Sequence, residues 1–328
     1  MEDTPINRTV HFCIVTTIIT AFVCGTQSAF AQSWPAKPVR LIVTAPAGGS
    51  LDFVGRLVAQ GLTASLGQSV LVDNRSGANG AIGAELAAKS PADGYTLLIV
   101  GNNFWVVQFM QDHVPYDPVR DFAPVTLAVR TPNILIVHPS LPVRSVKELI
   151  ALAKARPGQL NYASGSSGST VHLAAELFKS MAGVNIVHVP YKGIGPALID
   201  LMAGQTQMMF GLSVMSHVRS GRLRALAVTT LDPSDLAPGL PTVAASGLPG
   251  FESAVIYSVL ARAGTSPAII QRLNQDIGRH LNGAEVKTLL LNDGSEAVAS
   301  TPAQLSTTVK AEITRWGKII KDIGLRAE

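Results

Sequence analysis

Glycine-rich turns are the residues of this chain whose types and spacing point to chemistry. The first is Pro46-Ala47-Gly48-Gly49-Ser50-Leu51-Asp52, and similar turns occupy residues 165–170 and 191–196. Each stands between a short apolar run and a helix-like pattern. A strand that turns through glycines into a helix directs free backbone N–H groups and the positive end of the helix dipole toward one point. These turns predict capture of an anion.

Enzyme motifs with similar composition do not match. Residues 77–83, Gly-Ala-Asn-Gly-Ala-Ile-Gly, lack the G-x-G-x-x-G spacing, and no G-x-x-x-x-G-K-[ST] occurs, so nucleotide binding is not expected. Four residues beyond Gly165 stands Ser169, so the nucleophile-elbow pattern G-x-S-x-G also fails. A serine hydrolase with His172, His188 or His217 as base remains an alternative, because catalytic triads are defined by geometry.

No cofactor or metal is expected. His172 and Glu176 are four residues apart on one helical pattern, but no third ligand follows at a recognisable spacing, so we interpret His172 as a residue that caps or packs near the helix start. Asp52 has two open interpretations. It stabilises the helix dipole as an acid in the first turn, or it holds a water or a ligand donor in a cleft.

The elements that must position these turns alternate along the chain. Strand-like runs at 39–44, 70–73, 96–100, 133–137, 160–164, 186–189, 207–210 and 225–228 alternate with helical patterns at 51–66, 81–89, 145–155, 171–181 and 196–202. This order predicts βαβ units and a mostly parallel sheet, interrupted by a loop at 112–124. A strand at 255–261 and helices at 267–281 and 302–323 complete the pattern. The expected class is α/β, with two lobes and a ligand in the cleft between them.

The N-terminus and the composition bear on the compartment and on partners. Residues 1–31 read as a signal peptide, with an apolar stretch at 10–24 and Ala29-Phe30-Ala31 as the cleavage pattern, so we expect export to the periplasm with cleavage near Ala31. Both cysteines, Cys13 and Cys24, lie in this segment.

The net charge of +4 is spread over 328 residues and forms no clustered basic stripe, so nucleic acid is not an expected partner.

A set of short motifs, in order, resembles one family. The motifs are Trp34-Pro-Ala-Lys-Pro-Val-Arg40, Pro46 to Asp52, Val72-Asp-Asn-Arg75, Asp93-Gly-Tyr-Thr-Leu-Leu98, Pro115-Tyr-Asp-Pro118, Asp121-Phe-Ala-Pro-Val125, His188-Val-Pro-Tyr-Lys-Gly193 and Gly221 to Val228. Together they resemble the periplasmic solute-binding proteins of the tripartite tricarboxylate transporter type, the Bug family. The resemblance covers essentially the whole chain after residue 31. It implies a two-lobed periplasmic-binding-protein fold, the Venus flytrap, that closes on a small carboxylate, an organic or amino acid.

The resemblance also implies a ligand site made of backbone amides and short hydroxyl side chains. The matching positions are Ala47, Gly48, Gly49, Ser50, Asp52, Ser164, Ser166, Ser167, Ser169 and Thr170. Asn103, Tyr191 and Gly211 are further candidates for this site. Several charge-assisted bonds of about 1.5–3 kcal/mol each can offset the desolvation of a carboxylate, so no arginine is required.

Two segments depart from the family pattern. Phe210-Gly211-Leu212 stands where the family commonly has Phe-Asp-Asn, which removes a carboxylate and an amide from a rim that shapes specificity. The segment Gly101 to Trp105 brings Phe104 and Trp105 near the expected cleft. These aromatic residues are either core or hinge contacts, or a wall that favours a bulky acid.

The resulting hypothesis is a monomeric, non-enzymatic binding protein that delivers a carboxylate to membrane transporter subunits. Its expected division is a signal peptide at 1–31, a first domain of 32–131 plus 252–328, and a second domain of 132–251. Closure is expected near Arg130–Pro132 and Pro249–Glu252, where the chain crosses between the domains. A sensor that presents the same ligand to a membrane receptor is an alternative that sequence does not separate from transport.

Overall fold

Two β-sheets organise the protein. The computed structural model describes residues 34–111, 113–165, 168–212 and 214–325, so the expected signal peptide and two site residues, Ser166 and Ser167, lie outside the described part. Lys37–Glu328 forms one structural unit, which contains both sheets. Within the described residues no helix is both long and apolar enough to cross a membrane.

The first sheet has six strands in the order β11-β4-β10-β3-β1-β2. They are β1 (Val39–Val43), β2 (Val70–Asn74), β3 (Thr96–Val100), β4 (Phe122–Pro132), β10 (Ala254–Arg262) and β11 (Glu296–Ala297). β1 pairs in parallel with β2 and β3, whereas β10 runs antiparallel to both β3 and β4. Four of the five β1 residues are buried, as expected for a strand covered on both faces.

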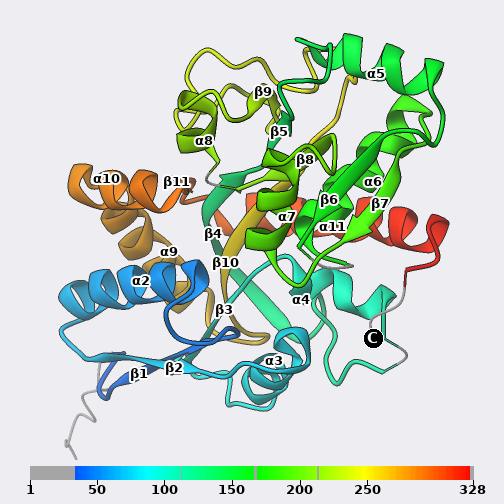
Figure 1. The fold of residues 1–328 in the computed structure, drawn as a ribbon. Helices are drawn as coiled ribbons and strands as arrows, with labels where there is room; N and C mark the ends of the chain where they lie inside the picture. The colour runs from blue at the N-terminus through cyan, green and yellow to red at the C-terminus, as the bar shows by residue number, and fades with distance from the viewer. Residues whose placement is uncertain (1–33, 112, 166–167, 213, 326–328) are drawn as a thin grey trace, which may run out of the picture. The chain divides into compact units, whose positions relative to one another are not determined.

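Helices cover both faces of this sheet (Figure 1). α2 (Ser50–Leu66) connects β1 to β2, and α3 (Ala81–Ala88), preceded by the short η1 (Ala78–Gly80), leads from β2 to β3 on the other side of β1. Because both crossovers are right-handed and run in opposite directions across the sheet, α2 and α3 lie on opposite faces. α9 (Pro267–Leu281) packs beside α2, and α10 (Ala284–Asp293) follows it.

The second sheet has five strands in the order β7-β6-β8-β5-β9. They are β5 (Ile134–Val137), β6 (Asn161–Ser164), β7 (Val187–Pro190), β8 (Met208–Gly211) and β9 (Arg224–Val228). β6 is parallel to β7 and β8, and β5 is antiparallel to β8 and β9. The helices α5 (Val146–Ala155), α6 (Thr170–Ala182), α7 (Ile194–Met202) and α8 (Met215–Arg219) connect these strands.

The prediction of a mostly parallel sheet was wrong, because each sheet contains both parallel and antiparallel strand pairs. The βαβ units are parallel as predicted, but β4 and β10 connect the two sheets and run antiparallel to each other. The expected loop at 112–124 was also wrong at its end, since β4 begins at Phe122. Pairing with β10, more than 120 residues away along the chain, stabilises this proline-containing strand.

Two short connections join the sheets. β4 ends at Pro132 and β5 begins at Ile134, while the return segment reaches β10 at Ala254, which pairs with Pro132. Asn133 lies in the first connection and Ser253 in the second, and the Thr229 hydroxyl hydrogen-bonds to backbone atoms of both. The two connections therefore lie side by side.

The C-terminal helix α11 (Pro302–Asp322) begins at a capping box in which Thr301 and Gln304 exchange side-chain to backbone hydrogen bonds. It packs on β4, on α6 and on the short α4 (Asn103–Val106), so it contacts elements next to both sheets. Its buried side chains include Leu305, Trp316 and Ile320. Figure 1 shows it beside α4 and α6, in red.

Candidate functional site

A large open pocket, with a volume of about 970 Å³, lies at the carboxyl ends of strands from both sheets. The first sheet contributes residues after β1, β2 and β3 and at the start of β10: Thr44, Ala45, Pro46, Leu51, Ser76, Gly77, Asn79, Gly80, Gly101, Asn102, Asn103, Phe104, Met110, Val255 and Tyr257. The second sheet contributes residues after β6, β7 and β8: Gly168, Ser169, Thr170, Pro190, Tyr191, Lys192 and Leu212. Ligands of open α/β sheets bind at such strand ends.

The charge of the pocket favours an anion. Lys192 is the one lining residue with a charged side chain among the described residues, and none of the lining residues described is an acid. Burial raises the pKa of Tyr191 to about 12, helped by the hydrogen bond that its hydroxyl donates to Asp200. Burial and the nearby Asp293 carboxylate likewise raise the pKa of Tyr257 to about 12. Both tyrosines are therefore neutral near pH 7.

The first glycine turn borders the pocket through Pro46 and Leu51. Gly48 has a φ of 89°, in the left-handed region that favours glycine, and Gly49 precedes α2 without a side-chain cap. The first N–H groups of a helix have no intrahelical acceptor, so α2 presents donors at this edge. Ala47, Gly48, Gly49 and Ser50 are exposed next to the lining, and the Ser50 hydroxyl is 3.4 Å from the Asp293 carboxylate.

Asp52 is turned into the fold. The residue is 3% exposed, and its carboxylate accepts hydrogen bonds from the Gly48 N–H at 2.9 Å, from Arg56 at 3.0 Å and from Asn74 at 2.9 Å. Burial alone raises the pKa of Asp52, but the hydrogen bonds from Arg56, Gly48 and Asn74 outweigh it and hold the pKa below its ordinary value. These contacts favour the structural interpretation, in which Asp52 holds the turn that contains Gly48.

The second glycine turn, at residues 165–170, contacts a stack of aromatic rings through Gly168. His172, 5% exposed, accepts a hydrogen bond from the Gly168 N–H at its Nδ1, at 2.9 Å. Its ring stacks on His188 with centroids 4.1 Å apart, and His188 stacks on Tyr162 at 4.8 Å. Among the described residues of this turn, the Gly168 N–H is bound within the fold, and Ser169 and Thr170 line the pocket beside it.

The second and third glycine turns touch each other. The Gly193 N–H donates to the Gly165 carbonyl at 2.6 Å, and Gly193 has a φ of 111°. A Cβ on Gly165 would lie 3.0 Å from the Ile194 nitrogen and 3.1 Å from the Gly193 carbonyl carbon. Only glycine at position 165 allows this approach, which sets Gly168–Thr170 and Tyr191–Lys192 on one wall of the pocket.

The structure places the expected site residues in different surroundings. Asn103, Ser169, Thr170 and Tyr191 line the pocket. Ser164 is fully buried, and its hydroxyl contacts His188 Nε2 at 2.7 Å. Gly211 is buried at the end of β8, where an added Cβ would lie 2.6 Å from Val214 Cγ1, and it is the next residue, Leu212, that lines the pocket.

The aromatic pair is divided in the same way. Phe104 reaches the lining, but the residue is only 3% exposed, and its ring stacks on that of Tyr116 with centroids 4.8 Å apart. Trp105 is fully buried and does not reach the lining. The core interpretation therefore holds for Trp105, and Phe104 offers the pocket only a small part of its ring.

Sequence reasoning missed several lining residues. Ser76, Gly77, Asn79 and Gly80 follow β2 and were not expected at the site. Gly77, Asn79 and Gly80 all have a positive φ, and this run of turn-forming residues between a strand and a helix was the available signal. Lys192, Met110 and Tyr257 were also missed, and Tyr257 carries no local signal because its position depends on the pairing of β10.

The geometry does not support the hydrolase alternative. The Ser164–His188 pair has the spacing of a nucleophile and its base, but Ser164 has no exposed surface and does not line the pocket. Nδ1 of His172 is occupied by the Gly168 N–H. Within the described residues no group of three His, Cys, Asp or Glu side chains is arranged to hold a metal ion.

Comparison with known proteins gives a consistent match. A family model described as "Tripartite tricarboxylate transporter family receptor" matches residues 54–325. Protein BugT from Bordetella pertussis is 39% identical over 300 residues, which are 90% of this chain and 92% of BugT. The structure of R. palustris Rpa4515 with adipate has 40% identity and a TM-score of 0.71, over 89% of this chain and 99% of that one. The structure of MatC from Rhodopseudomonas palustris with bound malate has 28% identity and a TM-score of 0.67, over 88% of this chain and all of MatC.

Proposed function

This chain belongs to the receptor family of tripartite tricarboxylate transporters, and we propose that its pocket captures a small carboxylate in the periplasm and delivers it to the membrane subunits of such a transporter. The family consists of solute-binding receptors, which are not enzymes. The binding-protein fold and the family that the sequence indicated are thus confirmed. We also propose that the ligand is a carboxylate, that the signal peptide is cleaved near Ala31 and that the protein is monomeric.

The observation that carries the proposal is the character of the lining. Lys192 supplies the charge, α2 and α6 begin at the pocket edge, and Ser169, Thr170 and Asn103 are short polar residues without a competing acid among the described lining. Charge-assisted hydrogen bonds from such donors suit a carboxylate. Two structural relatives hold adipate and malate, both of which are dicarboxylates, and a second carboxylate would give Lys192 a partner.

Thermal unfolding of the mature protein against mono-, di- and tricarboxylates, amino acids and aromatic acids tests the proposal. An acid present at about one hundred times its Kd should add about 2.7 kcal/mol to the free energy of unfolding, which shifts the Tm by several degrees. A panel in which no acid shifts the Tm, with protein shown by mass spectrometry to carry no ligand, would contradict carboxylate capture.

A matched pair of lysine variants tests the pocket assignment. Lys192→Gln should weaken binding of the best acid about tenfold, because it removes one charge-assisted bond of about 1.5–3 kcal/mol from a partly solvated site. Lys154→Gln removes an exposed lysine from the last turn of α5, outside the lining, and should leave the affinity unchanged. Equal affinities of both variants and the wild type, measured by calorimetry, would remove Lys192 from the site.

A further inference from the structure

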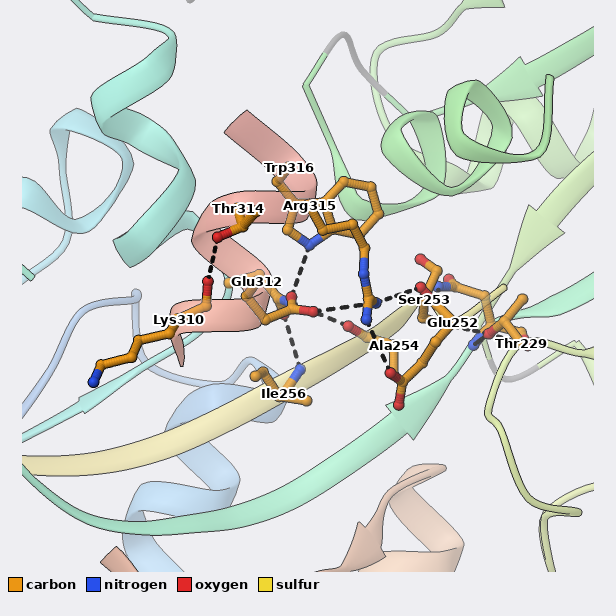
Figure 2. Close-up of polar contacts among 12 residues, drawn as sticks. Thr229, Glu252, Ser253, Ala254, Ile256, Lys310, Glu312, Thr314, Arg315 and Trp316 are labelled. Carbon is orange, nitrogen blue, oxygen red and sulfur yellow. Dashed lines mark hydrogen bonds and ion pairs between the residues drawn. The ribbon is translucent and has the colours of Figure 1, made fainter. Parts of the chain in front are cut away.

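The C-terminal helix carries a buried acid whose contacts lead to the pocket. Glu312 of α11 is 8% exposed, and Figure 2 shows it between Trp316, Arg315 and the start of β10. Its Oε2 accepts hydrogen bonds from Trp316 Nε1 at 2.7 Å and from Asn102 Nδ2 at 3.2 Å. Its Oε1 lies 3.4 Å from Arg315 Nη1. We call Glu312, Arg315 and Trp316 the α11 polar cluster.

Asn102 lines the pocket, and the N–H groups and the oxygen of its side-chain amide are all hydrogen-bonded within the fold. Its Oδ1 accepts from the Ile256 N–H at 2.8 Å, and its Nδ2 donates to the Ala254 carbonyl at 3.1 Å and to Glu312. A primary amide has two N–H donors, so both are occupied and neither is free for a ligand. The side chain of Asn102 therefore fixes the pocket wall, at the point where β3 passes into α4 and reaches Asn103.

Arg315 links Glu312 to Glu252, which lies in the second of the two segments that join the sheets. Its Nη1 donates to the Glu252 carbonyl at 2.7 Å, and its Nη2 donates to the Glu252 carboxylate at 3.1 Å. Ser253 follows, and its carbonyl accepts from the Thr229 hydroxyl (Figure 2). The Glu312 carboxylate thus contacts both Asn102 in the pocket wall and Arg315, which binds Glu252 in this connection.

Stability alone is a poor explanation for this acid. Burial raises the pKa of Glu312, although the bonds from Trp316 and Arg315 act in the opposite direction. A buried ion pair often stabilises a fold no more than apolar residues of similar volume would. A role in positioning explains why an acid stands where α11, Asn102 and Glu252 meet.

We propose that Glu312 is a positioning residue for the ligand pocket, which acts through Asn102 on the pocket wall and through Arg315 on the connection at Glu252–Ala254. The ligand does not touch it. Affinity for ligand then depends on a side chain of the C-terminal helix that lies outside the lining. This inference rests on the proposed function for its affinity measurement, but its structural part can be measured without ligand.

The test is the isosteric variant Glu312→Gln with adipate as the probe. Glutamine has one acceptor oxygen, so it satisfies either Arg315 or the Asn102–Trp316 side, and not both. We expect the affinity for adipate, measured by calorimetry well below the Tm, to fall about tenfold. Asp276→Asn is the matched control, because Asp276 is also a buried acid, 3% exposed, paired with Arg272 and Arg279 on α9 outside the lining. It should lower the Tm without changing the affinity.

A double-mutant cycle separates positioning from general destabilisation. In an Asn102→Ala background, Glu312→Gln should weaken binding by much less than tenfold, since residues that act as a unit are not additive. Full additivity, or an unchanged affinity of Glu312→Gln in the wild-type background, would overturn the proposal.

Hydrogen exchange decides the structural part in the ligand-free protein. Exchange of the Ile256 amide, which donates to Asn102 Oδ1, should rise in Glu312→Gln and stay at the wild-type rate in Asp276→Asn. An unchanged exchange rate in Glu312→Gln would overturn the proposal, whether or not adipate binds the wild type. Failure of adipate to bind the wild-type protein would count only against adipate as the ligand. If Glu312→Gln does not fold, Arg315→Gln, at a side chain 25% exposed, removes the part of this link that runs from Glu312 through Arg315 to Glu252, and it is judged by the same two measurements.

Discussion

The imidazole of His172 ties the pH dependence of stability to the second anion turn. The Gly168 N–H donates to Nδ1, so the neutral ring with its proton on Nε2 is the form that fits. Burial lowers the pKa of His172 to about 4, and the adjacent His188 contributes to this shift. Burial lowers the pKa of His188 as well. Protonation of His172 therefore opposes folding.

We expect stability to decline on acidification through this residue. The folded-state pKa lies below the unfolded value of about 6.5, so the contribution is complete above pH 6.5 and is lost as the pH falls toward about 4. A single group of this kind changes the free energy of unfolding by at most about 1.4 kcal/mol per pH unit. His172→Asn keeps an acceptor for the Gly168 N–H but does not titrate. Urea unfolding at pH 7, 6 and 5 should show a shallower decline for the variant, and parallel curves would contradict the assignment.

Single residues also show the limit of reading a site from sequence. The glycine turns identified the edge of the pocket because backbone geometry follows from glycine itself. The direction of a side chain depends on its neighbours, so Ser164, expected at the ligand, contacts His188, and Asp52 contacts Gly48 and Asn74. None of these three partners is adjacent in sequence to the residue that it redirects.

At the scale of elements, sequence pattern predicted the helices that bury one face and the strands that are short apolar runs. α9 at Pro267–Leu281 and β3 at Thr96–Val100 agree with the sequence at both ends. Pairing between distant segments was not predictable, which is why β4 and the antiparallel partners of β10 were missed. α10 was missed because it follows α9 after Asn282-Gly283, and its apolar pattern is short.

The contact between the turns after β6 and β7 predicts the effect of one methyl group. Gly165→Ala should lower the free energy of unfolding by about 1–3 kcal/mol, because its Cβ meets backbone atoms of Gly193 and Ile194 that have little room to move. It should also weaken acid binding, since both turns line the pocket. Gly195→Ala is the control: its Cβ meets no atom within 4 Å, and alanine favours the helix α7 by about 0.5–1 kcal/mol. Comparable stability of the two variants in urea would refute this packing argument.

At the scale of the whole molecule, the pocket takes walls from both sheets, which the chain joins through two short segments. Asn133 stands alone between β4 and β5, and Glu252 and Ser253 precede β10. Hinges are commonly a few residues at the ends of elements that absorb a change in backbone angles. The division into domains 32–131 plus 252–328 and 132–251, with closure about these segments, remains our prediction.

Closure should be visible by small-angle scattering of the mature protein. With a saturating acid from the thermal panel we expect a smaller radius of gyration than without it, because ligand bonds to both walls favour the closed state. An acid that produced no thermal shift serves as the control and should leave the profile unchanged. Superimposable profiles with and without an acid that calorimetry shows to be bound would mean that the sheets keep their arrangement. The connections at Asn133 and Ser253, held to each other through Thr229, would then serve as a rigid support for a preformed site and not as a hinge.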